Sequence, residues 1–233
     1  MESAGEVVIE APKARYTATA VASPGSVSGT VALRSPLAPA SPVPAGKDSL
    51  VCGAFIPDSS VQQSGDGLGS ALVWLDGVRS GKPLPLDKRV ELESVDCRLT
   101  PRVQAATMGG AVNVIGHDPF RQRLRFMVSG EDAPRVIVML LKDEQVIPTE
   151  QPLKGPGLVV VRDAEHDWPR AWIGVFDHPY FAVTKPDGSY TIDQVPPGTY
   201  TLSTWHERAG RTSQKVTVGA NGVVKVDVKL AGK

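Results

Sequence analysis

The sequence contains no long apolar run. No stretch of about 18 apolar residues occurs anywhere in the 233 residues, so no helix of this chain is expected to span a membrane. The first 25 residues also lack the apolar core of a signal peptide, because the short run VVI at residues 7–9 is too small for one. No export signal is therefore visible in this sequence.

The chain also lacks an excess of charge of either sign. Lys and Arg number 25, Asp and Glu also number 25, and the formal net charge is zero. Without a basic stripe, nothing in the composition favours nucleic-acid binding. The sequence has no G-x-S-x-G nucleophile turn, no zinc-protease helix motif and no Gly-rich loop that opens a helix. We therefore expect a protein that is not an enzyme.

Cysteine is scarce. Only Cys52 and Cys97 occur, and neither has a nearby His or second Cys at the spacing of a zinc site. One interpretation is two buried free thiols. The other is a single disulfide formed in an oxidising compartment. The residues by themselves leave both interpretations open.

What the chain does contain is typical of β-structure. It has 23 Gly, 20 Pro and many short runs of Val and Thr, and no long helical period. This pattern predicts an all-β protein. Residues 25–33 alternate as a strand, and residues 71–75 form a buried strand that Asp76-Gly77 ends. We interpret residues 1–25 as an extended arm and residues 35–46 as a Pro-rich connector.

The C-terminal part alternates strand and turn signals. Asp187-Gly188 predicts a hairpin turn before a strand, and Pro196-Pro197-Gly198 separates that strand from the next. Asn221-Gly222 is a second hairpin signal, between strands at residues 214–218 and 223–230.

Two phrases in this part carry a family resemblance. DGSYTIDQVPPGTYTL and DHPYFAVT…WHE resemble the carboxypeptidase regulatory-like (transthyretin-like) β-sandwich of bacterial exported proteins, which accompanies a cupredoxin-like domain there. The strands at residues 25–33 and 71–75 resemble the first two strands of that sandwich. We therefore predict a sandwich split between residues 26–85 and 176–233, with a second sandwich at residues 86–175. The resemblance implies no catalysis, favours the disulfide, and implies a periplasmic or extracellular location.

The inserted segment is predicted to be a Greek-key sandwich. Its seven expected strands lie at residues 90–92, 103–107, 111–115, 123–128, 135–141, 158–162 and 171–175. Strand order and length resemble the cupredoxin fold.

The resemblance also assigns copper-ligand positions. It places them at Gln122, Asp163, His166 and Pro169, where the family has His, Cys, His and Met. A blue-copper centre depends on the Cys thiolate, and only one of the four ligands remains. The expectation is a cupredoxin fold without copper and without any cofactor. The alternative is an altered site of His166, Asp163 and His117 that holds zinc or copper(II).

The main hypothesis is therefore a non-enzymatic, extracytoplasmic binding or scaffold protein. Its partner would be a protein, as in an accessory subunit of a membrane or electron-transfer complex. Arg121, Arg123 and Arg125 alternate with other side chains and are candidates for contacting an acidic partner surface or lipid headgroups. One alternative is a periplasmic metal-binding or electron-transfer protein. Another is carbohydrate binding through exposed Trp74, Trp168 or Trp205.

Overall fold

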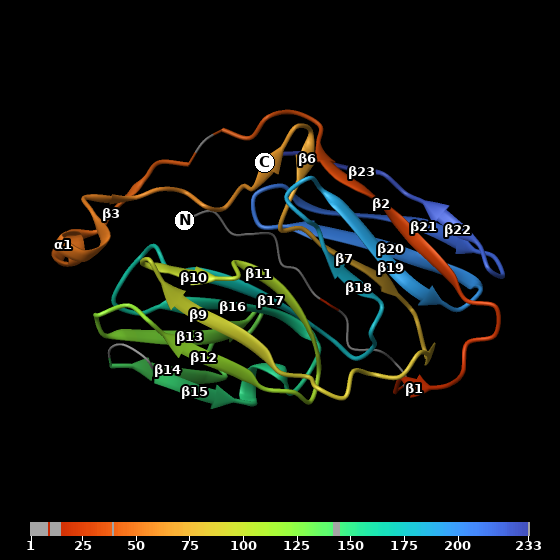
Figure 1. Cartoon of the computed structure of the whole chain (residues 1–233), viewed down its shortest axis with the longest axis horizontal. Helices are drawn as coiled ribbons and strands as arrows, with labels where there is room; N and C mark the ends of the chain where they lie inside the picture. Colours follow the sequence, from red (N-terminus) through yellow and green to blue (C-terminus); the bar gives the residue numbers. More distant parts are fainter. Residues whose placement is uncertain (1–8, 10–14, 39, 142–144, 233) are drawn as a thin grey trace.

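The chain folds into two β-sandwiches that lie beside one another along its long axis (Figure 1). The computed structural model describes residues 9, 15–38, 40–141 and 145–232. Helix is limited in these residues to α1 (Ser49–Cys52) and the 3-10 turns η1 (Gly46–Asp48) and η2 (Gln151–Leu153). The predicted all-β class with two sandwiches is confirmed.

Strands from both parts of the chain build the first sandwich. They are β2 (Gly25–Leu33), β5 (Gln63–Ser64), β6 (Gly67–Leu68), β7 (Leu72–Asp76), β18 (Phe181–Val183), β19 (Ser189–Val195), β20 (Gly198–His206), β21 (Gly210–Val218), β22 (Val223–Lys225) and β23 (Val228–Leu230). One sheet has the order β18-β7-β20-β21, and the other has the order β19-β2-β6-β5 with β22 and β23 on β2. Because β7 lies between β18 and β20, neither half of this sandwich can complete its core alone.

The second sandwich is formed by the intervening segment. Its strands are β9 (Val90–Val95), β10 (Arg98–Thr100), β11 (Val103–Thr107), β12 (Val112–Gly116), β13 (Gln122–Val128), β14 (Val136–Leu140), β15 (Gln145–Thr149), β16 (Gly157–Asp163) and β17 (Arg170–Phe176). The sheets have the orders β10-β9-β12-β15 and β11-β17-β16-β13-β14. The sequence did not predict β10 or β15. The predicted limits of the arm, of the two parts of the split sandwich and of the inserted sandwich, at residues 1–25, 26–85, 176–233 and 86–175, stay a prediction.

Both predicted hairpins are wrong, although both turns form. Gly188 has a φ of 78°, and Asp187 Oδ1 accepts a hydrogen bond from the Ser189 N–H at 3.0 Å. However, β18 pairs with β7 while β19 pairs with β2, so this turn carries the chain from one sheet to the other. Asn221, with a φ of 53°, does the same between β21 and β22. A turn signal sets the local chain direction, whereas burial of the sandwich core selects the strand partner.

The described part of the N-terminal arm lies against the first sandwich. In this part β1 (Thr17–Ala18) pairs in parallel with β8 (Ser80–Gly81), and the Tyr16 hydroxyl donates to the Lys82 carbonyl. Ile9 is buried in an apolar cluster between the sandwiches. The rest of the predicted arm, residues 1–8 and 10–14, lies outside the described residues.

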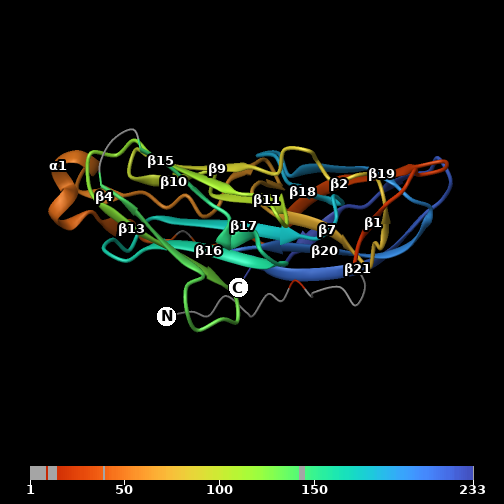
Figure 2. The same ribbon diagram turned by 90° about the horizontal axis from the view of Figure 1, so that it is seen from below.

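Aromatic side chains join the two sandwiches. Trp172 of β17 meets Trp205 of β20 edge to face, with ring centroids 5.0 Å apart. Phe176 packs on Trp74 at 5.7 Å and stacks on Phe181 at 4.8 Å. In the view of Figure 2, β17 continues towards β7 and β20 across this junction. One sheet of each sandwich thus buries its outer face against the other sandwich.

An excursion of the chain, residues 43–56, covers one end of the second sandwich. In it β3 (Val43–Pro44) pairs antiparallel with β4 (Phe55–Ile56), and η1 and α1 form the loop between them. Figure 1 shows α1 at the end of the molecule that is farthest from the first sandwich. Cys52 of α1 forms a disulfide with Cys97, and their Cα atoms are 5.8 Å apart. The two cysteines are therefore bridged.

Candidate functional site

The disulfide is anchored by a tight turn and a buried aspartate. Asp96 and Cys97 connect β9 to β10 and have φ values of 51° and 61°, in the left-handed region. Asp118 accepts a hydrogen bond from the Cys97 N–H at 2.9 Å and another from the Ser94 hydroxyl at 2.6 Å. Because Asp118 is buried, these bonds stabilise the turn that presents the cysteine to α1.

The residues assigned to the copper position gather at the same end of the second sandwich. Gln122 begins β13, Asp163 ends β16, and His166 and Pro169 lie in the loop before β17. All four are buried. His166 Nδ1 lies 2.5 Å from Asp163 Oδ2, and His166 Nε2 lies 2.9 Å from Asp48 Oδ2. Asp48 belongs to the excursion, so this imidazole connects the excursion to the sandwich.

Both nitrogens of His166 are thus engaged by carboxylates. A metal ion would have to displace one of these carboxylates to reach an imidazole nitrogen. The second oxygen of Asp163 accepts the Arg123 N–H at 2.8 Å. The rings of Phe120 and Trp168 flank the imidazole, with centroids 5.2 and 4.8 Å away. This arrangement is suited to holding the excursion in place.

The structure does not bring His117 to this pair. His117 follows β12 in the four-stranded sheet, its side chain is exposed, and its Nε2 lies 3.5 Å from Glu93. Asp163 instead ends β16 in the opposite sheet, and His166 follows that strand. Within residues 9, 15–38, 40–141 and 145–232, no group of three or more His, Cys, Asp or Glu side chains is placed to hold a metal. The alternative site of His166, Asp163 and His117 is therefore not assembled.

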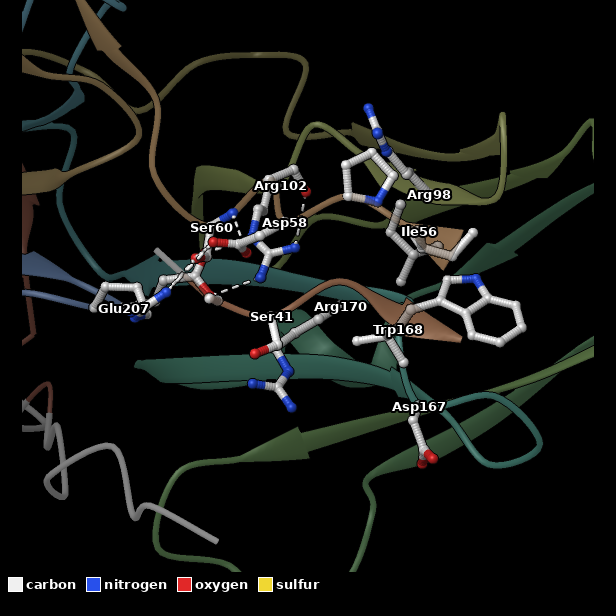
Figure 3. Close-up of a pocket in the computed structure, with 16 residues that line it drawn as sticks. Ser41, Ile56, Asp58, Ser60, Arg98, Arg102, Asp167, Trp168, Arg170 and Glu207 are labelled. Atoms are coloured by element: carbon white, nitrogen blue, oxygen red, sulfur yellow. Dashed lines mark hydrogen bonds and ion pairs between the residues drawn. The ribbon is translucent and has the colours of Figure 1, made fainter. Parts of the chain in front are cut away.

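A pocket of about 420 Å³ opens beside this end of the sandwich (Figure 3). Arg102 and Glu207 form a bidentate ion pair in its wall, at 2.5 and 2.8 Å. Arg208 reaches the Ser60 hydroxyl at 3.0 Å and Asp58 at 3.4 Å. The remaining wall combines polar and apolar residues: Ala40, Ser41, Val43, Ile56, Pro57, Ser59, Arg98, Leu99, Asp167, Trp168 and Arg170.

Two arginines of the pocket have no acidic partner in the described part of the chain. Figure 3 draws no ion pair or hydrogen bond from Arg98 or Arg170 to the other lining residues. Arg170 is half-buried, and burial lowers its pKa. Arg162 and Arg102 lower this pKa further, against the opposing effect of Glu207. The pocket therefore holds positive charge that the described acids do not balance.

Arg170 is also the inner member of an arginine row that crosses three strands. Arg125 of β13 is the cross-strand neighbour of Arg162 on β16, which is in turn the neighbour of Arg170 on β17. Cross-strand neighbours point to the same face of a sheet, and like charges placed opposite one another are unfavourable. Arg125 and Arg162 are exposed, and no acid of the described chain pairs with them. The sequence predicted neither Arg162 nor Arg170 for a site, because pairing between distant strands creates the row.

The other predicted contact residues lie nearby. Arg123 is exposed on the same face of β13 as Arg125, and Arg121 lies 3.4 Å from Glu165. Of the three Trp residues considered for carbohydrate binding, Trp74 and Trp205 are buried between the sandwiches. Only Trp168 lines the pocket.

The comparisons with known proteins concern the fold. A family model described as polysaccharide lyase family 4, domain II, matches residues 154–226. The chain is similar to the copper-containing nitrite reductase of Thermus scotoductus SA-01, with 20% identity and a TM-score of 0.34, over 44% of this chain and 24% of that one. It is also similar to a reduced Cu(I) form of amicyanin, with 11% identity and a TM-score of 0.28, over 40% of this chain and 86% of that one.

No curated protein matches the chain. The chain spans about a quarter of the length of the nitrite reductase chain. None of the helices in the described residues is long and apolar enough to cross a membrane.

Proposed function

We propose that the protein is a non-enzymatic, extracytoplasmic binding protein that acts as an accessory subunit of a larger assembly and does not transfer electrons. The observation that carries the proposal is that carboxylates occupy both nitrogens of His166. The one imidazole retained from the expected copper ligands is held between Asp163 and Asp48, under an excursion that the Cys52–Cys97 disulfide ties down. Asp163, at the position where the resemblance expects the thiolate, is a hard ligand that bonds to His166, and this supports a role without one-electron copper chemistry.

Two further observations support the location and the binding role. A disulfide persists in oxidising compartments, which fits the exported proteins that the carboxypeptidase regulatory-like phrases resemble. Arg123 and Arg125 are exposed on the five-stranded sheet beside the exposed apolar side chain of Ile137. A mixed basic and apolar face of this kind suits an acidic protein surface.

The test is capture of partners from the native membrane fraction with the full chain as bait. We expect a defined partner to bind the wild type and to be lost with Arg123→Glu/Arg125→Glu, because the substitutions reverse the charge of the face. Arg79→Glu is the matched control, because Arg79 is an exposed arginine of the other sandwich. Capture that is equal for both variants contradicts this binding face.

A copper titration of the same preparation tests the redox alternative. We expect no stoichiometric copper and no thiolate-to-copper charge-transfer band. Gln122→His/Asp163→Cys/Pro169→Met restores the expected ligand types and serves as the positive control. A band in the wild type would overturn the proposal.

A further inference from the structure

The five-stranded sheet ends in an edge strand that carries none of the usual protection. Among the described residues β14 pairs only with β13, and it lies along the rim of the second sandwich in Figure 1. Proteins protect exposed edges with Pro, charged side chains or bulges, because an open edge accepts a further strand. The edge strand β15 contains Pro148, β21 contains Lys215, and β19 has a bulge between Ile192 and Val195. β14 has the sequence VIVML and contains none of these.

The pairing register decides which backbone groups of β14 face outward. On β13, the Arg123 N–H donates to Asp163 Oδ1 at 2.8 Å and the Arg123 carbonyl accepts the Ala164 N–H at 2.9 Å, so both groups point towards β16. Hydrogen-bonded pairs alternate with non-hydrogen-bonded pairs along two antiparallel strands. The pair of Arg123 with Met139 is therefore of the second kind, and so is every second pair along β14. The N–H and carbonyl groups of Met139 and Ile137 thus point to the open edge.

The outer face beside this edge is basic. Ile137 and Met139 share that face of the sheet with their cross-strand neighbours Arg125 and Arg123. Both arginines are exposed and have no ion pair with an acid of the described chain. A residue on a strand added to β14 would lie two strand spacings from them, about 9.6 Å between backbones, a distance that an extended arginine and a glutamate span together. The face therefore favours a carboxylate at every second position of the added strand.

The inner side of the same edge is apolar. Val136 of β14 and Ile147 of β15 pack on the core of the second sandwich and stay partly exposed. These two strands end the two sheets at the same rim of the sandwich (Figure 1). The remaining side chains of an added strand would face this rim and extend the core. A second copy of β14 would supply apolar side chains but no carboxylate for the arginines, since VIVML contains no acid.

We infer that β14 is the docking edge for an extended segment of a partner protein that carries Glu or Asp at alternate positions and apolar residues between them. The segment adds antiparallel to β14, exchanges backbone hydrogen bonds with Ile137 and Met139, and places its carboxylates on Arg123 and Arg125. Backbone pairing supplies affinity, and the alternation of side chains supplies specificity. The inference rests on the binding face of the proposed function and adds the form in which the partner binds there.

The test is fluorescence anisotropy of the full chain with a labelled octapeptide of alternating valine and glutamate. We expect saturable binding by the wild type. Met139→Pro should weaken this binding by roughly tenfold or more, because it removes an outward N–H that the peptide needs. The bonds to β13 are retained, since Pro is tolerated on an edge strand where the N–H faces outward. Met139→Thr keeps this N–H, so its smaller effect measures the side chain alone.

Modified peptides test the pairing without any change to the protein. In the antiparallel arrangement the glutamates of the peptide pair with Ile137 and Met139. N-methylation of the glutamates should therefore abolish binding, whereas N-methylation of the valines should not. A peptide with lysine in place of glutamate should not bind either, because it repels Arg123 and Arg125. Equal binding of the lysine peptide, or equal effects of the two N-methylations, would overturn the inference.

Partner capture separates a failure of this inference from a failure of the proposed function. A native partner that is lost with Arg123→Glu/Arg125→Glu but retained by Met139→Pro would overturn the docking edge and leave the proposed function standing. Peptide binding as expected, without any captured partner, would overturn the proposed function alone. Unaltered thermal unfolding of Met139→Pro excludes misfolding. Self-association that Met139→Pro abolishes would also overturn the inference, because it would assign the edge to a second copy of the chain.

Discussion

His206 lies at the end of β20 without solvent exposure. Its Nδ1 accepts a hydrogen bond from the Arg208 backbone N–H at 3.2 Å, and its Nε2 has no partner in the described part of the chain. Burial lowers the pKa of His206 to about 4, an effect that Glu207 opposes and that Arg102 and Arg208 reinforce. Burial likewise lowers the pKa of His178, against the effect of Asp177 and Asp76. The fold therefore keeps the imidazole of His206 neutral in mildly acidic solution.

We expect the free energy of unfolding to decrease as the pH falls from about 6.5, the imidazole pKa of an unfolded chain, to about 4. Over this range the unfolded chain binds a proton at residue 206 that the folded chain excludes. The contribution of His206 is therefore fully present above the upper limit and lost at the lower one, a change of about 3 kcal/mol. Urea denaturation across this range measures it.

The control for this pH dependence is His206→Asn. The amide oxygen of Asn can replace Nδ1 as the acceptor for the Arg208 N–H, and Asn does not titrate. We expect the variant to lose less stability between pH values of about 6.5 and about 4 than the wild type. The free energy of unfolding of this variant in neutral solution measures any loss of packing that the substitution itself causes. Equal pH slopes for the two proteins would contradict the assignment.

At the scale of elements, the excursion at residues 43–56 depends on a few long-range bonds. The disulfide closes a loop with a sequence separation of 45, and Asp48 holds His166 at 2.9 Å. The surrounding cluster of Ala45, Ile56 and Cys97 is small. A segment with so little core of its own is stabilised mainly by its cross-links.

We expect Cys52→Ser/Cys97→Ser to lower the free energy of unfolding by about 2–4 kcal/mol, the usual effect of removing a disulfide. We also expect proteases to cut residues 43–56 first, because the released segment opens locally more often than the sandwiches do. Thermal unfolding with limited proteolysis measures both effects, and the wild type with reductant is the control. An unchanged cleavage pattern would show that the bridge does not hold the excursion.

At the scale of the whole molecule, the two sandwiches share one interface. Its centre is aromatic, with Trp172 against Trp205, and the Arg102–Glu207 ion pair lies at its margin beside the pocket. The exposed fraction of the Glu207 side chain is only 4%. A carboxylate buried to this degree is tolerated because Arg102 binds both of its oxygens.

Arg102→Ala should therefore lower the free energy of unfolding by about 3–5 kcal/mol, because it leaves the Glu207 charge buried without a partner. Chemical denaturation followed by tryptophan fluorescence measures this, since Trp172 and Trp205 lie in the interface. Arg102→Met/Glu207→Leu removes both charges and should recover most of the loss. A double variant as unstable as Arg102→Ala would show that packing, and not the unpaired charge, is responsible.

Much of the fold could be predicted because its signals are local. Alternation at residues 25–33 and the apolar run at residues 71–75 correspond to β2 and β7. The phrase at residues 184–202 marks its turns correctly, yet the hairpin inferred at Asp187-Gly188 is wrong, because this turn links different sheets. The strands β10 and β15 were missed because they are short or contain Pro148.

The candidate site was less predictable because its parts come from distant segments. His166 and Asp163 are near one another in sequence, but Asp48 reaches His166 across 118 positions. The sequence gives no sign of Arg162 and Arg170 as a pair, since each arginine alone is typical of a solvated strand face. Only the register of β13, β16 and β17 turns them into a row.

The sequence by itself determined most of the strands, the turns and the all-β class, because each depends on residue types at short spacing. The position expected for a thiolate ligand comes from the family resemblance. The tertiary structure decided which strands pair, that Cys52 meets Cys97, that both nitrogens of His166 are occupied, and that Arg98 and Arg170 line a pocket without an acidic partner among the described residues. These features depend on burying the faces of two sandwiches at once. That requirement brings together residues that are far apart in the sequence, and their local sequence does not predict the contact.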